Sequence, residues 1–82
     1  MAMASAPDPS EQIAERTYKR IVASTTKPAD VPKIIEEEVK ATPPGLIIEV
    51  KRRTRQKLIF AEQTSEKNNE NVKKAIDILK RQ

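Results

Sequence analysis

The segment that most constrains the fold is LIIEVKRRTRQKLIFAE, residues 46–62. Two apolar runs, rich in branched and aromatic side chains, flank KRRTRQK, which holds five positive charges within seven residues. Such side chains are enriched in β-strands, and a polar segment between two such runs is typical of a hairpin. The segment therefore predicts two antiparallel strands, residues 46–51 and 57–62, joined by a basic loop at the tip.

The alternation of side chains along each strand sets the expected register of this hairpin. With an odd number of loop residues within 52–56, the larger apolar side chains of both strands share one face. We therefore expect Phe60 to lie in the core opposite Ile48. Ile47 and Ile59 then fall on the outer face, where they are candidate contacts with a partner.

Helical periodicity governs the rest of the chain. Asp8 followed by Pro9 predicts the start of a helix that runs to about Ser24. Asp30 predicts the start of a second helix, which must stop before Pro43. A last helix carries a narrow apolar stripe that comprises Val72, Ala75, Ile76 and Leu79. The predicted fold is one small α+β domain, residues 8–82, of order α-α-β-β-α, in which the antiparallel hairpin packs against helices. Residues 1–7 are predicted to be a flexible tail.

The composition excludes most enzyme chemistry. The chain has no His and no Cys, which removes the common nucleophile and base arrangements and the usual zinc sites. Its single Gly excludes phosphate-binding glycine loops. Glu36, Glu37 and Glu38 form one acidic cluster, but neighbouring helical residues point about 100° apart, so we expect a solvated helix face. The sequence therefore predicts a non-enzymatic protein without a metal or cofactor.

The basic segment is the feature that predicts a function. The chain holds 16 Lys and Arg against 12 Asp and Glu, a net charge of +4, and no acid lies between residues 50 and 61. Arginine pairs with phosphate or carboxylate through two parallel hydrogen bonds. Our first interpretation is nucleic-acid binding, DNA or RNA, through backbone phosphates. The candidate contacts in the segment are Lys51, Arg52, Arg53, Arg55 and Lys57. The alternative is an adaptor or assembly subunit, in which the same cations or an exposed strand edge meet an acidic protein.

Two further candidate phosphate contacts lie near the C-terminus. The segment NVKKAIDILK, residues 71–80, resembles over its ten residues the lysine-led last helix of double-stranded RNA-binding domains. The third strand and the glycine loop that precede that helix in the family are missing here. The resemblance implies only that Lys73 and Lys74 are candidate phosphate contacts.

The length of the chain and its short apolar runs bound the remaining expectations. The runs LII and LIFA are far too short to cross a membrane, and the first residues lack the pattern of a signal peptide. We therefore expect a soluble intracellular protein, cytoplasmic or nuclear. A chain of 82 residues buries a thin core, and a two-stranded sheet has uncovered edges, so we also expect a homodimer or an obligate partner.

Overall fold

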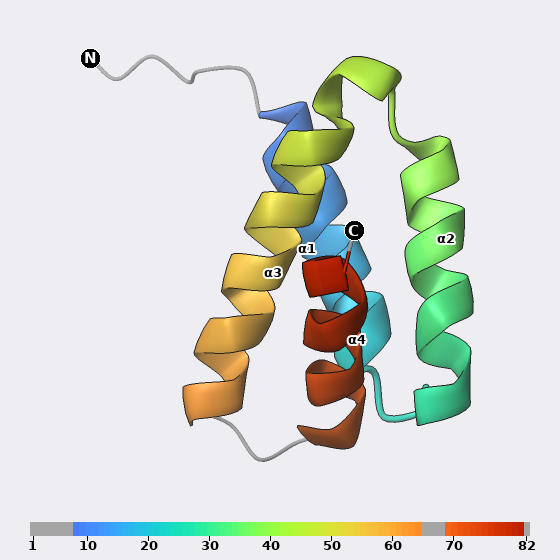
Figure 1. Cartoon of the computed structure of the whole chain (residues 1–82), viewed down its shortest axis with the longest axis vertical. Coiled ribbons are helices and arrows are strands. Elements are labelled where there is room, and N and C mark those ends of the chain that lie inside the picture. The colour runs from blue at the N-terminus through green and yellow to red at the C-terminus, as the bar shows by residue number, and fades with distance from the viewer. Residues whose placement is uncertain (1–7, 65–68, 82) are drawn as a thin grey trace.

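The computed structural model describes residues 8–64 and 69–81, and within these ranges the chain is helical with no β-strand (Figure 1). The predicted flexible tail, residues 1–7, lies outside the described residues. Two short 3-10 turns, Pro28–Asp30 and Pro44–Leu46, lead into the second and third helices. The α-helices are α1 (Pro9–Val22), α2 (Val31–Ala41), α3 (Ile47–Thr64) and α4 (Asn69–Arg81). The predicted α+β fold with a β-hairpin is therefore wrong.

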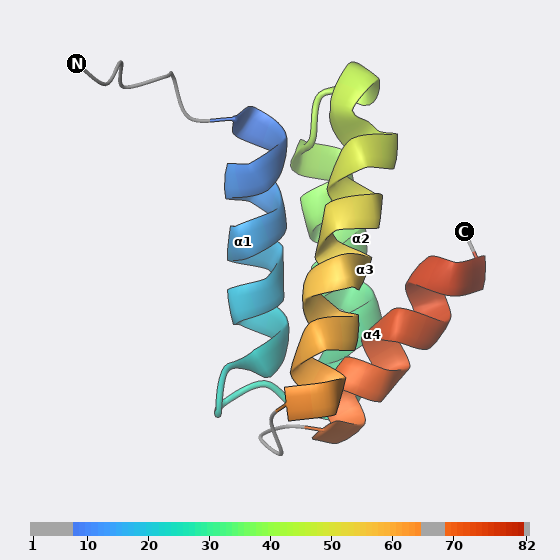
Figure 2. The same ribbon diagram turned by 90° about the vertical axis from the view of Figure 1, so that its left-hand side faces the viewer.

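The four helices alternate in direction along the chain. α1 and α3 run the same way and lie side by side, while α2 and α4 run the opposite way (Figures 1 and 2). Figure 2 shows that α4 is inclined to the other three helices, so that its C-terminal end diverges from them. This divergence sets the shape of the surface between α4 and its neighbours.

The helices predicted on either side of residues 46–62 are confirmed. α1 begins where expected, because the Asp8 carboxylate accepts a hydrogen bond from the main-chain nitrogen of Ser10 at 2.9 Å. α2 has Pro32 in its first turn and ends at Ala41, before Pro43. α4 buries Val72, Ala75 and Leu79 of the predicted apolar stripe.

One continuous helix, α3, replaces the predicted hairpin. Its buried side chains recur at helical spacing: Val50, Thr54, Leu58 and Ala61. The supposed loop KRRTRQK contains no Gly, Pro, Asn or Asp, and Arg, Lys and Gln are good helix formers. Branched side chains favour strands only weakly, and the burial of a helical stripe against α1 and α4 outweighs that preference.

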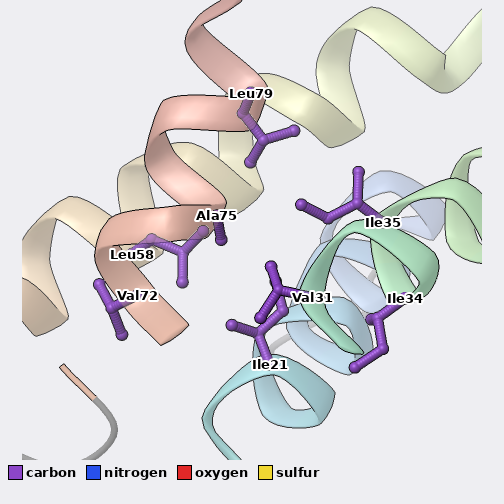
Figure 3. Close-up of a cluster of buried hydrophobic side chains, with 8 residues drawn as sticks. All are labelled: Ile21, Val31, Ile34, Ile35, Leu58, Val72, Ala75 and Leu79. Atoms are coloured by element: carbon purple, nitrogen blue, oxygen red, sulfur yellow. The ribbon is translucent and has the colours of Figure 1, made fainter. Parts of the chain in front are cut away.

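The predicted register is wrong for the same reason. Ile48 is 83% exposed and Phe60 is 68% exposed, so neither belongs to the core. The core forms instead where the four helices converge (Figure 3). Its buried side chains come from every helix: Ile21, Val31, Ile34, Ile35, Leu58, Val72, Ala75 and Leu79.

Candidate functional site

The five cations of residues 51–57 are distributed around α3 instead of being gathered at a tip. Three of them have carboxylate partners. Arg52 binds Glu49 one turn earlier in the same helix, at 2.8 Å. Arg53 and Lys57 point toward α1 and bind carboxylates there. Although no acid lies between residues 50 and 61, the segment is therefore partly neutralised by acids of α1 and of the start of α3.

Arg53 is the centre of an ion-pair network between α1 and α3. Its guanidinium donates to Glu49 at 2.6 Å and to Glu11 at 3.0 Å, and it lies 3.1 Å from Asp8. Lys57 extends the network, because its ammonium bridges Glu11 and Glu15. Two cations of α3 thereby hold three carboxylates on or next to α1.

The network changes the proton affinities of its members. Hydrogen bonds from Lys57 and then Arg53 hold the pKa of the Glu11 carboxyl below its ordinary value of 4.5. Hydrogen bonds to Glu11 and Glu15 raise the pKa of Lys57 above 10.5. Arg53 and Lys57 therefore help to pack α1 on α3, which leaves them less available to a ligand.

A second ion-pair network, which was not predicted from the sequence, joins α1 to α2. Glu38 is buried at 6% exposure, and it accepts hydrogen bonds from Arg16 and Arg20, each at 2.8 Å. Burial raises the pKa of Glu38, but the hydrogen bonds from the two arginines outweigh it, so the pKa lies below 4.5. Arg20 also binds Glu37 at 2.9 Å.

The expectation of a solvated acidic cluster at residues 36–38 is correct for Glu36 and Glu37 and wrong for Glu38. Within the described ranges, no group of three acidic side chains is arranged to hold a metal ion.

The two remaining cations of the segment, Lys51 and Arg55, have no ion pair with any residue that the structure describes. Both line grooves beside α4. We call these grooves the α2–α4 groove and the α3–α4 groove, and together they form the basic face.

The α2–α4 groove is open and has a volume of about 580 Å³. One wall is α2, which contributes Pro32, Glu36, Val39 and Lys40. The opposite wall is α4, which contributes Lys74, Asp77, Ile78 and Arg81. Lys51 of α3 completes the lining. The half-buried Val39 and Ile78 make its apolar part, and the exposed Lys40 and Lys74 and the half-buried Lys51 border it.

The α3–α4 groove lies on the other side of α4 and has a volume of about 320 Å³. Lys51 lines it too, so the two grooves share this residue. Its apolar lining is the exposed Ile48 with Leu79. Its other cations are Arg52, Arg55 and Lys80.

The basic face concentrates the positive charge of the chain. Its two grooves hold seven basic and two acidic side chains, a formal charge of +5, whereas the whole chain carries +4. Arg52 and Arg81 are bound to Glu49 and Asp77. The other five cations lack a carboxylate partner among residues 8–64 and 69–81: Lys40, Lys51, Arg55, Lys74 and Lys80.

The structure unites only some of the predicted site residues. Lys51 and Lys74 line the same groove, whereas Lys73 is exposed on α4 outside both grooves. Ile47 and Ile59 are twelve residues apart in one helix, about 18 Å along its axis, so they do not form one patch.

Lys40, Lys80 and Arg81 belong to the basic face but were missed in the sequence. The signal for the α4 wall was present, since Lys74, Asp77, Ile78 and Arg81 follow the spacing of one helix face. The α2 wall had no such signal, because its position opposite α4 depends on how the helices pack.

Comparisons with protein-family models, with curated proteins and with solved structures found no match. No helix in the part of the chain that the structure describes has the length and apolar character needed to span a membrane.

Proposed function

We propose that this protein is a non-enzymatic adaptor that binds an acidic, partly apolar segment of a protein partner in the α2–α4 groove. The observation that carries the proposal is the combination of an apolar lining with cations that have no carboxylate partner within the described residues. We expect this adaptor to act inside the cell.

The chemistry of the lining favours this class of ligand. Val39 and Ile78 give apolar contact, which contributes about 25 cal/mol for each Å² removed from water. Lys40, Lys51 and Lys74 form no ion pair within the described residues, and with Arg81 they outnumber the two acids of the lining, Glu36 and Asp77. Complementary charge speeds association and selects among partners, while apolar burial supplies affinity. A ligand with carboxylates and a few apolar side chains satisfies both parts of the groove.

Strand pairing with a partner, which the predicted hairpin allowed, has no basis in the described residues. The described residues contain no strand, so they offer no row of unpaired main-chain groups to which a strand can add. The predicted basic hairpin tip does not form, and the basic face takes its place as the candidate binding surface.

A titration with synthetic peptides tests the proposal. The probe is a glutamate-rich peptide with leucines at i, i+3, i+4 and i+7, compared with a peptide in which serine replaces the leucines. We expect the leucine peptide to bind more tightly, because only it uses the apolar lining. No binding of either peptide at about 50 mM salt would contradict the proposal.

A matched pair of variants locates the binding. One variant carries Lys40→Gln, Lys51→Gln and Lys74→Gln, all in the groove. The control carries Lys27→Gln, Lys33→Gln and Lys73→Gln, exposed lysines outside both grooves. Each variant loses the same charge. We expect the groove variant to weaken peptide binding by at least about tenfold and the control to change it by less than about twofold. Equal losses would show non-specific attraction.

A second candidate function, nucleic-acid binding through phosphates, is favoured by the +5 charge of the basic face and by its five unpaired cations in the described chain. Each phosphate contact to duplex DNA contributes about −0.9 to the slope of log affinity against log salt. Titration with duplex and single-stranded oligonucleotides at about 50 mM and about 200 mM salt tests it. Oligonucleotide binding that is tighter than binding of the leucine peptide, and lost in the groove variant, would replace the adaptor by this candidate.

A further inference from the structure

We infer that the occupant of the α2–α4 groove is an amphipathic helix whose acidic residues lie in its first turns and whose axis runs antiparallel to α2 and α4. The inference rests on the proposed function and specifies the partner and its orientation. It follows from the spacing of side chains along the two groove walls and from the unequal positive charge at the two ends of the groove.

Both walls present side chains at helical spacing along helices that run in the same direction, although α4 is inclined to α2 (Figure 2). On α2 the lining residues fall at i, i+4, i+7 and i+8, from Pro32 to Lys40. On α4 they fall at i, i+3, i+4 and i+7, from Lys74 to Arg81. Such rows form the ridges between which the side chains of a third helix pack, with axes about 8–10 Å apart. Each wall is about 10–12 Å long, which is two turns, so the occupant needs three or so turns.

The cations are concentrated at one end of this groove. Lys40 lies in the last turn of α2 and Arg81 in the last turn of α4. These two helices run in the same direction, but α4 ends level with the middle of α2, so of the two cations only Lys40 lies at the end of the groove (Figure 1). α3 begins where α2 ends, so Lys51, in its second turn, also lies toward this end. Lys74 is the single lining cation toward the other end.

The charge at each helix end then decides the orientation of the occupant. Carboxylates are favourable in the first turn of a helix because the N-terminus carries partial positive charge. A helix with acidic first turns places those carboxylates next to Lys40 and Lys51, which have no ion pair within the described residues, only when its N-terminus lies at this end. In that orientation its N-terminal partial charge also meets the negative C-terminal end of α2. A parallel occupant loses both contributions.

Two blocked peptides of identical composition test the orientation. Both carry leucines at i, i+3, i+4 and i+7; one has its glutamates in the first turns and the other in the last turns. Circular dichroism of each complex monitors helicity, because the second peptide is intrinsically the poorer helix. We expect the first peptide to bind at least about tenfold more tightly than the second.

A spin label reports the orientation independently of affinity. A nitroxide at the N-terminus of the first peptide should broaden the amide signals of Lys40 and Lys51 much more than those of Lys33 and Lys74. Broadening centred on Lys33 and Lys74, or equal at both ends, would overturn the antiparallel helix even if the peptide binds.

The remaining outcomes separate this inference from the proposed function. Binding of both peptides without helix formation would overturn the helical occupant and leave the adaptor role in place. Absence of binding by both would remove the proposed function and this inference together. Lys40→Gln should reduce the preference between the peptides, whereas the matched control Lys74→Gln, which removes the same charge at the other end of the groove, should preserve it.

Discussion

The side-chain amide of Asn71 in α4 donates a hydrogen bond to the main-chain carbonyl oxygen of Ile21 in α1 at 3.0 Å. The same amide nitrogen donates to the carbonyl oxygen of Thr26 at 2.8 Å. Ile21 lies in the last turn of α1, where carbonyl groups have no partner within the helix. The hydroxyl of Thr26 satisfies a neighbouring carbonyl, that of Arg20, at 2.6 Å. One buried side chain thereby joins α4 to the end of α1 and to the connection that leads into α2.

Removal of the Asn71 amide should destabilise the fold. Asn71→Ala leaves two carbonyl groups without this donor, and an unsatisfied buried polar group costs about 1–3 kcal/mol. Asn71→Asp should cost more at neutral pH, because a carboxylate has no proton to donate and faces two carbonyl oxygens. Urea unfolding of both variants measures the change, with Glu70→Ala at the exposed neighbouring position as control. If the three midpoints agree, Asn71 does not hold these elements together.

Leu58 and Phe60 distinguish the helix from the hairpin in one experiment. Leu58 is fully buried in the core, and Leu58→Ala should lower the free energy of unfolding by about 2–5 kcal/mol. Phe60 is 68% exposed, and Phe60→Ala should change it by no more than about 0.5 kcal/mol. In the hairpin that the sequence suggested, Phe60 instead faces the core. Thermal or urea unfolding decides: a large loss in the Phe60 variant would favour the hairpin over the helix.

Glu38 should make stability depend on pH. Its pKa in the folded state lies below 4.5, so its contribution is present above that value and is lost as the pH falls through the folded pKa. Glu38→Gln should therefore lower the free energy of unfolding by about 1.5–3 kcal/mol at neutral pH, which is the typical contribution of a hydrogen bond to a charged group. The difference from wild type should shrink as the pH is lowered, because the wild-type carboxyl then becomes neutral as well.

The neighbouring Glu36 supplies the matched control for this measurement. It is exposed and has no ion pair with any described residue, so Glu36→Gln should change the free energy of unfolding at neutral pH by no more than about 0.5 kcal/mol. Guanidinium or urea midpoints recorded from about pH 3 to pH 7 compare the three proteins. A Glu38→Gln deficit that stays constant over this range would mean that the interaction of this carboxylate with Arg16 and Arg20 is not what is lost.

The sequence identified the helices that have clear start signals and failed where propensity and packing disagree. α1 and α2 begin with an Asp and an early proline, features that act locally and are readable in the chain. α3 has no such start signal, and its isoleucines and Phe60 are residues that are common in strands. Two features argued for the helix: the spacing of Val50, Thr54, Leu58 and Ala61, and the acid at Glu49 placed to bind Arg52 and Arg53.

The site was less predictable than the fold, because it depends on contacts between helices. Lys51 and Lys57 look alike in the sequence, yet only Lys57 meets carboxylates, which belong to a helix more than forty residues away. The burial of Glu38 is likewise decided by the approach of α1. No local pattern reports which charge of a cluster is paired across a tertiary contact.

Lys51 and Lys57 therefore provide the last prediction, since they carry the same charge on the same helix. Lys57 binds Glu11 and Glu15 and is held at a raised pKa, so Lys57→Gln should lower stability at neutral pH by up to about 1 kcal/mol. Its contribution is present below 10.5 and is lost as the pH rises through the folded pKa, so the deficit should vanish in strong alkali. Lys57→Gln should leave binding of the acidic leucine peptide unchanged.

Lys51→Gln should show the opposite pattern. Lys51 lines both grooves without an ion pair in the described residues, so its loss should weaken peptide binding and change stability by no more than about 0.5 kcal/mol. Unfolding midpoints and peptide titrations on the two single variants, recorded at the same salt concentration, separate the roles. If Lys57→Gln weakens binding as much as Lys51→Gln does, the ligand contacts the α1 side of α3 too, and the basic face is not the binding surface.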